Sequence, residues 1–251
     1  MRGGRGIWVL VVAVAVAASL WWERTDPPGP PAPGSPSREE LGRLLASVTV
    51  VFQRPHVPGY QRGCEAGEAC VFGPAWSDDH PGRGGRDGCD TRNNVLARDL
   101  HEAMFRPGTG KCVVLSGTLD DPYTGRRILF RRSDARAVHV DHIFPLAAAW
   151  DLGAATWPQH LRRQFANDID FNLIAVDGTA NEDKRDHTPG DWLPPAASTR
   201  CWFAGKYLTV AVRYGLPVTA ADHRALTDAA AACPDAAQMP AARPARSFDS
   251  S

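Results

Sequence analysis

The chain has 251 residues, with 28 basic and 28 acidic side chains, a formal charge of zero at neutral pH and a pI near 7.1. This length is ample for one domain with a substantial core. The even charge argues against a protein that coats nucleic acid by bulk charge, although it leaves room for a local basic surface.

Residues 1–25 have the features of a targeting segment. Arg2 and Arg5 precede an uncharged stretch that ends at Trp22, with small residues at 15–17 as a cleavage site. We expect a signal peptide, because the flank after Trp22 is not basic; a retained N-terminal membrane anchor is the alternative. Either outcome places the remaining chain outside the cytoplasm, secreted or held on the outer side of the cytoplasmic membrane.

Residues 26–36 are rich in proline and predict a stiff, solvated linker. The sequence S-R-E-E from Ser37 is a capping-box pattern, and the apolar residues after it have helical spacing. Residues 53–90 are rich in Gly, Pro, Asp and Cys and predict a long loop tied by disulfides. We expect a single domain over 37–233, followed by a disordered Ala/Pro-rich tail over 234–251.

Helical and strand patterns alternate through this domain. Asp90 predicts the start of a helix whose Leu96, Leu100 and Met104 face inward. A β-hairpin follows, in which CVVLSGTL and RRILFRR flank the turn DDPYTG. After it come the strand VHVDHIFPL, one or two short helices, the strand NLIAV, a turn at Asp177-Gly178, a helix beginning in TANEDKRD and a final helical pair. This order predicts an α+β fold.

The six cysteines are an even set in a chain expected to be exported, which favours disulfides. No C-x-x-C pair occurs, which argues against a zinc ribbon. Cys201 opens one helix of the final pair and Cys233 closes the other, so antiparallel packing brings them together. The expected pairs are Cys201–Cys233, Cys64–Cys70, which closes a small loop, and Cys89–Cys112, which follows by elimination.

Asp141 and His142 lie side by side in an otherwise apolar strand. Burying both costs several kcal/mol unless they are paired or bind a metal. Adjacent strand residues point to opposite faces, so the two share one site only where the strand twists or ends. Pro145 favours an end there.

Three further polar residues complete a candidate site: Asn172 beside the second strand, and Asn181 and Lys184 in the helix that follows it. Carboxylate and amide oxygens suit a hard cation such as Mg²⁺ or Mn²⁺. A neutral histidine beside that cation can deprotonate a water for attack on phosphorus. An internally satisfied polar pair is the alternative interpretation of Asp141 and His142.

The ordered segments VDHIFPL, DFNLIAV and ANEDKRD resemble the HNH, or ββα-metal, endonuclease signature. More narrowly, they resemble exported HNH proteins related to the C-terminal domain of GmrSD-type nucleases. The resemblance covers about 88–233 and includes GCDTRN, LSGTLDDPYTG, FAND, DWLPP and the RYGL helix junction. It implies a ββα core at about 138–190, with flanking helices and the hairpin around it.

The resemblance also implies residue roles. His142 would be the general base, and Asp141 and Asn181 the protein ligands of the metal. Asn172 would brace the loop or orient the base, and Lys184 would approach a phosphate. Two positions depart from the usual N-x-S-K-G-D pattern, since Asp183 replaces a small polar residue and Arg185 a glycine.

Basic residues upstream of the site suggest a phosphate contact. Arg127, Arg131 and Arg132 belong to a run of five arginines within 126–136, which forms either a phosphate-facing edge of the hairpin or a solvated face. Arg92 either approaches the scissile phosphate or belongs with Asp90 to a helix N-terminus. His139 and His142 spell H-x-x-H, but this spacing on a strand argues against a zinc site.

These observations predict an exported, metal-dependent endonuclease that hydrolyses DNA, with RNA as the alternative substrate, and with low sequence specificity. The alternative is a non-catalytic cell-surface binding protein that keeps the HNH scaffold. The extra carboxylate of Asp183 gives that alternative most weight.

Overall fold

The computed structural model describes residues 30–239, and those after Pro30 belong to one compact unit that begins at Pro31. The expected signal peptide or anchor lies outside this range. No helix within 30–239 is long and apolar enough to cross a membrane.

The helices are α2 (Arg38–Ser47), α3 (Thr91–Asp99), α4 (Leu146–Asp151), α5 (Gln159–Ala166), α6 (Gly178–Lys184), α7 (Arg200–Tyr214) and α8 (Ala220–Ala230), with 3₁₀ turns η1 (Ala135–Ala137), η2 (Ala154–Thr156) and η3 (Ala197–Thr199). The strands are β1 (Val50–Val51), β2 (His101–Phe105), β3 (Val114–Asp120), β4 (Arg127–Arg131), β5 (Val138–His142), β6 (Leu173–Asp177) and β7 (Val218–Thr219), so the fold is α+β as predicted.

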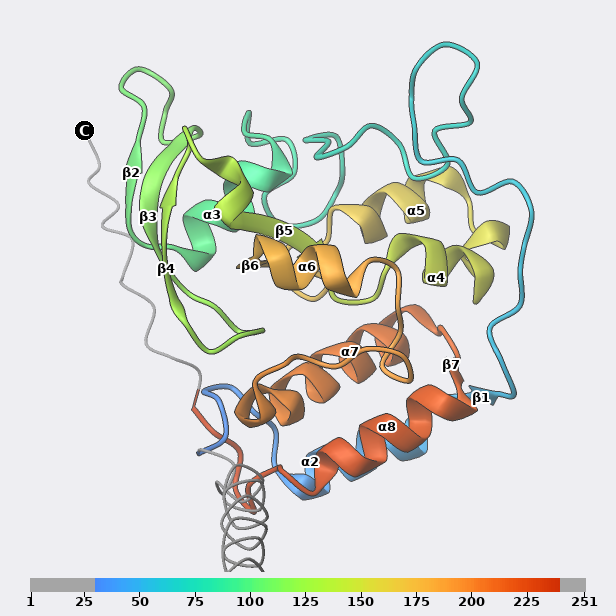
Figure 1. The fold of residues 1–251 in the computed structure, drawn as a ribbon. Coiled ribbons are helices and arrows are strands. Elements are labelled where there is room, and N and C mark those ends of the chain that lie inside the picture. Colours follow the sequence, from blue (N-terminus) through green and yellow to red (C-terminus); the bar gives the residue numbers. More distant parts are fainter. Residues whose placement is uncertain (1–29, 240–251) are drawn as a thin grey trace, which may run out of the picture. The chain divides into compact units, whose positions relative to one another are not determined.

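The centre of the described unit is formed by β5, β6 and α6 (Figure 1). The two strands pair antiparallel, with Asp141 opposite Ile174. α6 follows β6 directly, because the Asp177 carboxylate accepts a hydrogen bond from the Ala180 amide (2.8 Å) and caps the first turn. The turn expected at Asp177-Gly178 is therefore the beginning of the helix itself. Since α6 packs against both strands, the three elements form a ββα unit.

This ββα unit lies between two apolar clusters. Val138 and Val140 of β5 join a cluster formed with α3, β3 and β4. Ile143 and Phe144, just beyond the end of β5, enter a second cluster with α4, α5, α7 and α8. Because side chains alternate along a strand, positions 139 and 141 face away from the first cluster. That face is where polar side chains gather.

A three-stranded antiparallel sheet, ordered β2-β3-β4, packs with α3 beside the ββα unit (Figure 1). The predicted hairpin is confirmed as β3 and β4. The helix predicted from Asp90 is shorter than expected, because the chain leaves helical geometry at Leu100 and residues 101–105 become β2. Leu100 is buried as expected, but Met104 lies on β2 and is 65% exposed. The expectation that Met104 faces inward is wrong.

The remaining helices α2, α7 and α8 pack together on another side of the ββα unit (Figure 1). α2 begins with the predicted capping box: the Ser37 hydroxyl accepts from the Glu40 amide (3.1 Å), and the Glu40 carboxylate accepts from the Ser37 amide (2.8 Å). The Cys201–Cys233 disulfide joins the start of α7 to the chain just after α8. A short parallel pair, β1 with β7, closes this layer.

The segments flanking the expected domain are more ordered than predicted. In the linker, the Ala32 amide donates to Ser198 O (2.9 Å), and Ser35 is buried. The first residues of the expected disordered tail also form backbone hydrogen bonds, from Arg38 N to Pro234 O (2.9 Å) and from Gln238 N to Ser35 O (2.8 Å). Residues 31–36 and 234–239 therefore belong to the folded unit, and the rest of the tail lies outside the described residues.

The loop over 53–90 is largely irregular, as predicted, and carries the Cys64–Cys70 disulfide. Cys89–Cys112 ties the end of this loop to the segment that leads into β3. The three disulfides are the pairs expected from the sequence, and no described cysteine is free. Cys64–Cys70 closes a small loop within the 53–90 segment, and Cys89–Cys112 holds the C-terminal end of that segment.

Candidate active site

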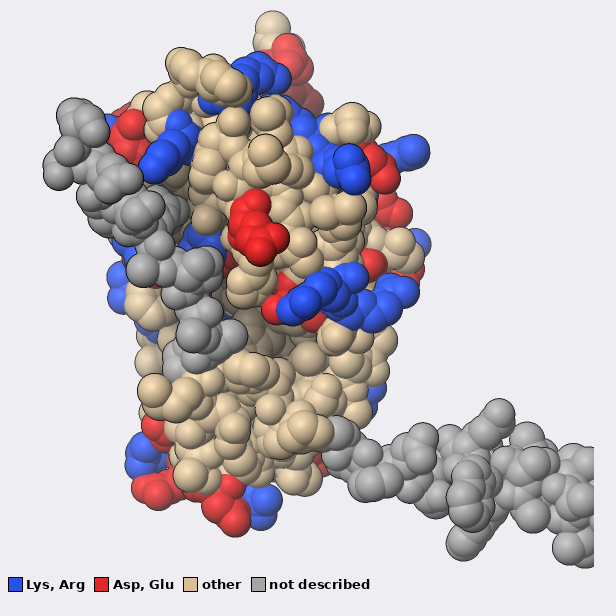
Figure 2. Space-filling model, turned by 90° about the vertical axis from the view of Figure 1, so that its left-hand side faces the viewer, with Lys and Arg blue, Asp and Glu red and all other residues tan. Residues whose placement is uncertain are grey.

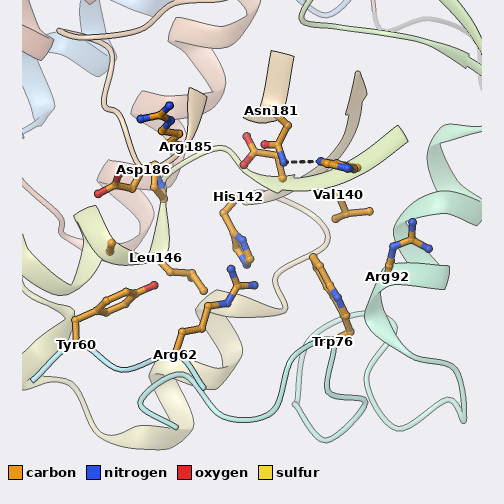
Figure 3. Close-up of a pocket in the computed structure, with 14 residues that line it drawn as sticks. Tyr60, Arg62, Trp76, Arg92, Val140, His142, Leu146, Asn181, Arg185 and Asp186 are labelled. Carbon is orange, nitrogen blue, oxygen red and sulfur yellow. Dashed lines mark hydrogen bonds between the residues drawn. The ribbon is translucent and has the colours of Figure 1, made fainter. Parts of the chain in front are cut away.

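A pocket of about 460 Å³ opens between β5, α6 and the 53–90 loop (Figure 3). Asp141 and His142 from β5 and Asn181 from α6 line it together. The structure thus brings three of the five predicted core site residues to one cavity. Within a strand, Asp141 and His142 would point to opposite faces. Because β5 ends at His142, both side chains can line the same pocket.

Asp141 is buried and held on one oxygen. Its Oδ2 accepts a hydrogen bond from the Tyr123 hydroxyl (2.6 Å) and forms an ion pair with the Lys184 ammonium (2.9 Å). Burial and the Asp141 charge raise the pKa of Tyr123 well above its ordinary value, so the phenol stays a donor. Both contacts use Oδ2, which leaves Oδ1 available to a ligand in the pocket.

His142 is held in the tautomer that a general base requires. Its Nε2 lies 2.9 Å from the Ala166 carbonyl oxygen, which can only accept, so Nε2 carries the proton and Nδ1 does not. Burial, reinforced by the positive charge of Arg62, lowers the pKa of His142 to about 3. The ring is therefore neutral near pH 7, which is the form that takes up a proton.

Asn172 is fully buried and lies outside the pocket. Its Oδ1 accepts from the Phe144 amide (2.9 Å), and its Nδ2 donates to the carbonyls of Phe144 and Phe165 (3.4 Å each). The Asn172 carbonyl also accepts from the Ile143 amide (2.8 Å). These bonds fix the chain immediately after His142, which fits the bracing role that the family resemblance implies.

His139 also lines the pocket, although no role beyond the rejected zinc pattern was considered for it from the sequence. The Asn181 Nδ2 lies 3.3 Å from His139 Nδ1 (dashed in Figure 3), so the amide nitrogen donates to the ring and Asn181 Oδ1 is left for a ligand. The other ring nitrogen of His139 lies close to Gly178 at the start of α6. The alternation of strand side chains could have found this residue, since 139 and 141 share one face.

Lys184 does not reach the pocket. Its side chain is fully buried, and its Nζ donates to the His142 carbonyl (2.9 Å) besides pairing with Asp141. An ammonium enclosed in this way cannot approach a substrate phosphate, so that expectation is corrected. Lys184 instead joins α6 to the end of β5 and positions the Asp141 carboxylate.

Three arginines line the pocket: Arg62 from the 53–90 loop, Arg92 from α3 and Arg185 after α6 (Figure 3). None of the three forms an ion pair with a carboxylate within residues 30–239. Burial and the nearby charge of Arg132 lower the pKa of Arg92 from its ordinary value. An arginine guanidinium keeps its proton in proteins. Uncompensated guanidinium groups around one cavity are suited to an anionic ligand.

The predicted arginines of the hairpin lie elsewhere. Arg127 pairs with Asp120 (2.8 Å), and Arg132 donates to the Asn93 side chain (3.3 Å). Neither they nor Arg131 line the pocket. On the face of the molecule shown in Figure 2, basic and acidic side chains adjoin one another in small groups, with uncharged surface between the groups. A nucleic-acid contact by these three arginines stays a prediction.

Two acidic residues near α6 differ in position. Asp183, the departure that favoured a non-catalytic protein, is exposed and does not line the pocket. Asp186 does line it, but its carboxylate pairs with Arg54 (3.1 Å), which also pairs with Asp151 (2.7 Å). The extra carboxylate at 183 therefore gives no direct reason to expect repulsion of a phosphate in the pocket.

Comparison with known proteins agrees with this geometry. Residues 90–229 match the model of the family described as "GmrSD restriction endonucleases, C-terminal domain". The chain belongs to this family. A relative from Arthroderma benhamiae, an "Uncharacterized secreted protein", is 33% identical over 221 residues, which cover 88% of this chain and 98% of the relative. No solved structure matches the chain. The matched family region contains the whole ββα unit, but Arg62 and the 53–90 loop precede it.

Proposed function

We propose that this protein is a metal-dependent endonuclease that hydrolyses phosphodiester bonds in DNA, with RNA as the alternative substrate. The observation that carries the proposal is the content of one pocket: within residues 30–239, a neutral His142 keeps Nδ1 without a hydrogen bond, Asp141 keeps one oxygen without a partner, and three arginines form no ion pair. The first two supply a base and a ligand, and the arginines match a phosphate. Family membership supports the same assignment.

The residues present fit a divalent cation such as Mg²⁺ or Mn²⁺. Asp141 Oδ1 and Asn181 Oδ1 are oxygen donors of the kind these cations prefer. Within residues 30–239 there is no cluster of three or more His, Cys, Asp or Glu that could enclose a metal. A site with two protein oxygens suits a cation that keeps waters and binds substrate phosphate. Bound there, the cation would stabilise the charge that develops on the phosphoryl oxygens and the leaving oxygen.

The protein's own residues account for the remaining steps. Arg62, Arg92 and Arg185 bind the phosphate oxygens and hold the diester against His142. His142 Nδ1 takes a proton from water as the water oxygen bonds to phosphorus. One ester P–O bond then breaks, and the departing oxygen takes a proton from solvent. Because guanidinium–phosphate contacts do not read bases, we infer low sequence specificity.

The location proposed for this activity is extracellular. Three disulfides are typical of proteins that fold in an oxidising compartment, and the Arthroderma benhamiae relative is named as secreted. A membrane anchor within residues 1–25 stays a prediction.

The proposal is tested by nicking of supercoiled plasmid with purified protein in Mg²⁺, in Mn²⁺ and in EDTA, alongside the variant Asn181→Ala. Glu182→Ala, an exposed neighbour on α6, is the matched control. We expect nicking with either metal, none in EDTA, a strong loss in Asn181→Ala and no loss in Glu182→Ala. Tight DNA binding without nicking in any metal would overturn the proposal in favour of a binding protein.

A further inference from the structure

Trp76 has no role in the chemistry described above, although it lines the same pocket. It belongs to the 53–90 loop, before the region that matches the family. Its indole ring lies nearly parallel to the His142 ring, with centroids 6.0 Å apart and planes inclined by 11°. In Figure 3 the ring lies between His142 and Arg92. A flat aromatic group thus stands beside the expected position of the scissile phosphate.

The position of Trp76 is fixed by unusual local structure. Its φ of +56° is a left-handed conformation that bulky residues rarely adopt and that persists where surrounding contacts enforce it. Here the Thr91 amide donates to Trp76 O (3.2 Å), and the Thr91 hydroxyl donates to Ser77 O (2.8 Å). Thr91 is fully buried and precedes Arg92 on α3. The aromatic ring and the phosphate-binding arginine are therefore held by one anchor.

Part of the Trp76 ring packs against the cluster around α3, which is a structural role. The side chain is nevertheless only half-buried, and its indole N–H forms no hydrogen bond within the described residues. A tryptophan that served only the core would be expected to bury most of its ring and to pair its N–H. Trp76 keeps a surface on the pocket instead.

A nucleotide whose phosphate contacts Arg62 and Arg92 carries a base within reach of this surface. Stacking on an aromatic side chain is tolerant of sequence, because every base has a π-face. In a duplex that face is covered by neighbouring bases, so only an unpaired base can use it. We propose that Trp76 is a stacking platform for an unpaired nucleobase next to the scissile phosphate, and that the enzyme prefers single-stranded nucleic acid. This inference rests on the proposed function.

The test compares cleavage of one oligonucleotide as a single strand and as a duplex by wild-type protein, Trp76→Phe and Trp76→Leu. Trp157→Leu, in which a tryptophan outside the pocket is lost, is the matched control. We expect kcat/KM to be higher on the single strand and to fall there by about 5- to 150-fold in Trp76→Leu, with Trp76→Phe retaining most of it. The duplex rate should change less, and Trp157→Leu should keep the wild-type preference for the single strand.

A second readout separates stacking from a merely structural role. In single strands with one abasic position moved along the sequence, wild-type protein should lose cleavage at one fixed offset from that position, and Trp76→Leu should show no such offset. Equal cleavage of single strand and duplex, or an unchanged preference in Trp76→Leu, would overturn the inference while leaving the nuclease proposal intact.

If wild-type protein cut neither substrate, the nuclease proposal would fail. The stacking role of Trp76 would then be tested by the binding of single-stranded DNA. Fluorescence anisotropy with labelled oligo(dT) should then show binding that weakens in Trp76→Leu. Binding equal in the two proteins would overturn the stacking role.

Discussion

The buried ion pair of Lys184 and Asp141 gives the sharpest stability prediction. The Lys184 side chain is 0% exposed and that of Asp141 9%, with 2.9 Å between Nζ and Oδ2. Lys184→Met removes the ammonium and leaves the carboxylate with the Tyr123 hydroxyl as its remaining partner. Breaking a buried pair from one side costs about 3–5 kcal/mol. In a domain of this size each kcal/mol lowers the melting temperature by about 2–4 °C, so we expect a loss of roughly 10 °C.

The double variant Asp141→Leu with Lys184→Met separates this cost from lost packing. Replacing both charges with apolar groups is often close to neutral, so the double variant should be more stable than Lys184→Met alone. Mn²⁺ should also raise the melting temperature of Lys184→Met more than that of wild-type protein, since the cation would bind beside an uncompensated carboxylate. Differential scanning calorimetry measures all three proteins.

A melting temperature for Lys184→Met within about 1–2 °C of wild type would refute this reasoning, because an exposed lysine usually changes the free energy of unfolding by less than about 0.5 kcal/mol. Combined with weakened DNA binding, that result would restore the phosphate contact first expected from the sequence.

Three further predictions concern neighbouring residues. Arg185 has φ +51°, a conformation that costs about 1–3 kcal/mol for residues other than glycine and little for glycine. Arg185→Gly should therefore melt at a higher temperature, but it should bind DNA more weakly in an anisotropy titration. His139→Ala should weaken Mn²⁺ binding in calorimetry by about 10- to 100-fold, because Asn181 loses the acceptor that orients its amide; equal affinity would contradict the orienting role. The pKa of His142 is about 3 in the folded protein and near 6.5 in the unfolded chain, so on acidification the unfolded chain takes up this proton first. The free energy of unfolding should therefore fall as the pH drops from 6.5 toward 3. In His142→Gln this fall should be smaller.

The sequence allowed much of the ββα unit to be predicted, because local signals and chemistry agreed there. Short apolar runs marked β5 and β6, and the Asp177 region marked the start of α6. Cys201–Cys233 followed from the ends of the final helical pair and Cys64–Cys70 from a small loop, which left Cys89–Cys112 by elimination. Each of these features depends on residues close in the chain or on a simple antiparallel return.

The failures depend on contacts that sequence spacing does not show. Met104 has helical spacing from Leu100, yet pairing with β3 makes its segment a strand and leaves its side chain exposed. Lys184 is near the site along the helix, but it faces the end of β5, where Asp141 is its partner. Arg62 and Trp76 reach the pocket only through the path of a long irregular loop, which periodicity cannot predict.

The central claim is that His142 is the general base of a phosphodiester hydrolysis. The most direct test measures plasmid cleavage by His142→Ala at saturating Mn²⁺, with Mn²⁺ affinity measured by calorimetry on the same protein and His223→Ala as a matched control. The account predicts unchanged metal binding in His142→Ala and a rate lower by at least about 100-fold, the usual contribution of a general base, with His223→Ala equal to wild type. Cleavage by His142→Ala at the wild-type rate would contradict the account.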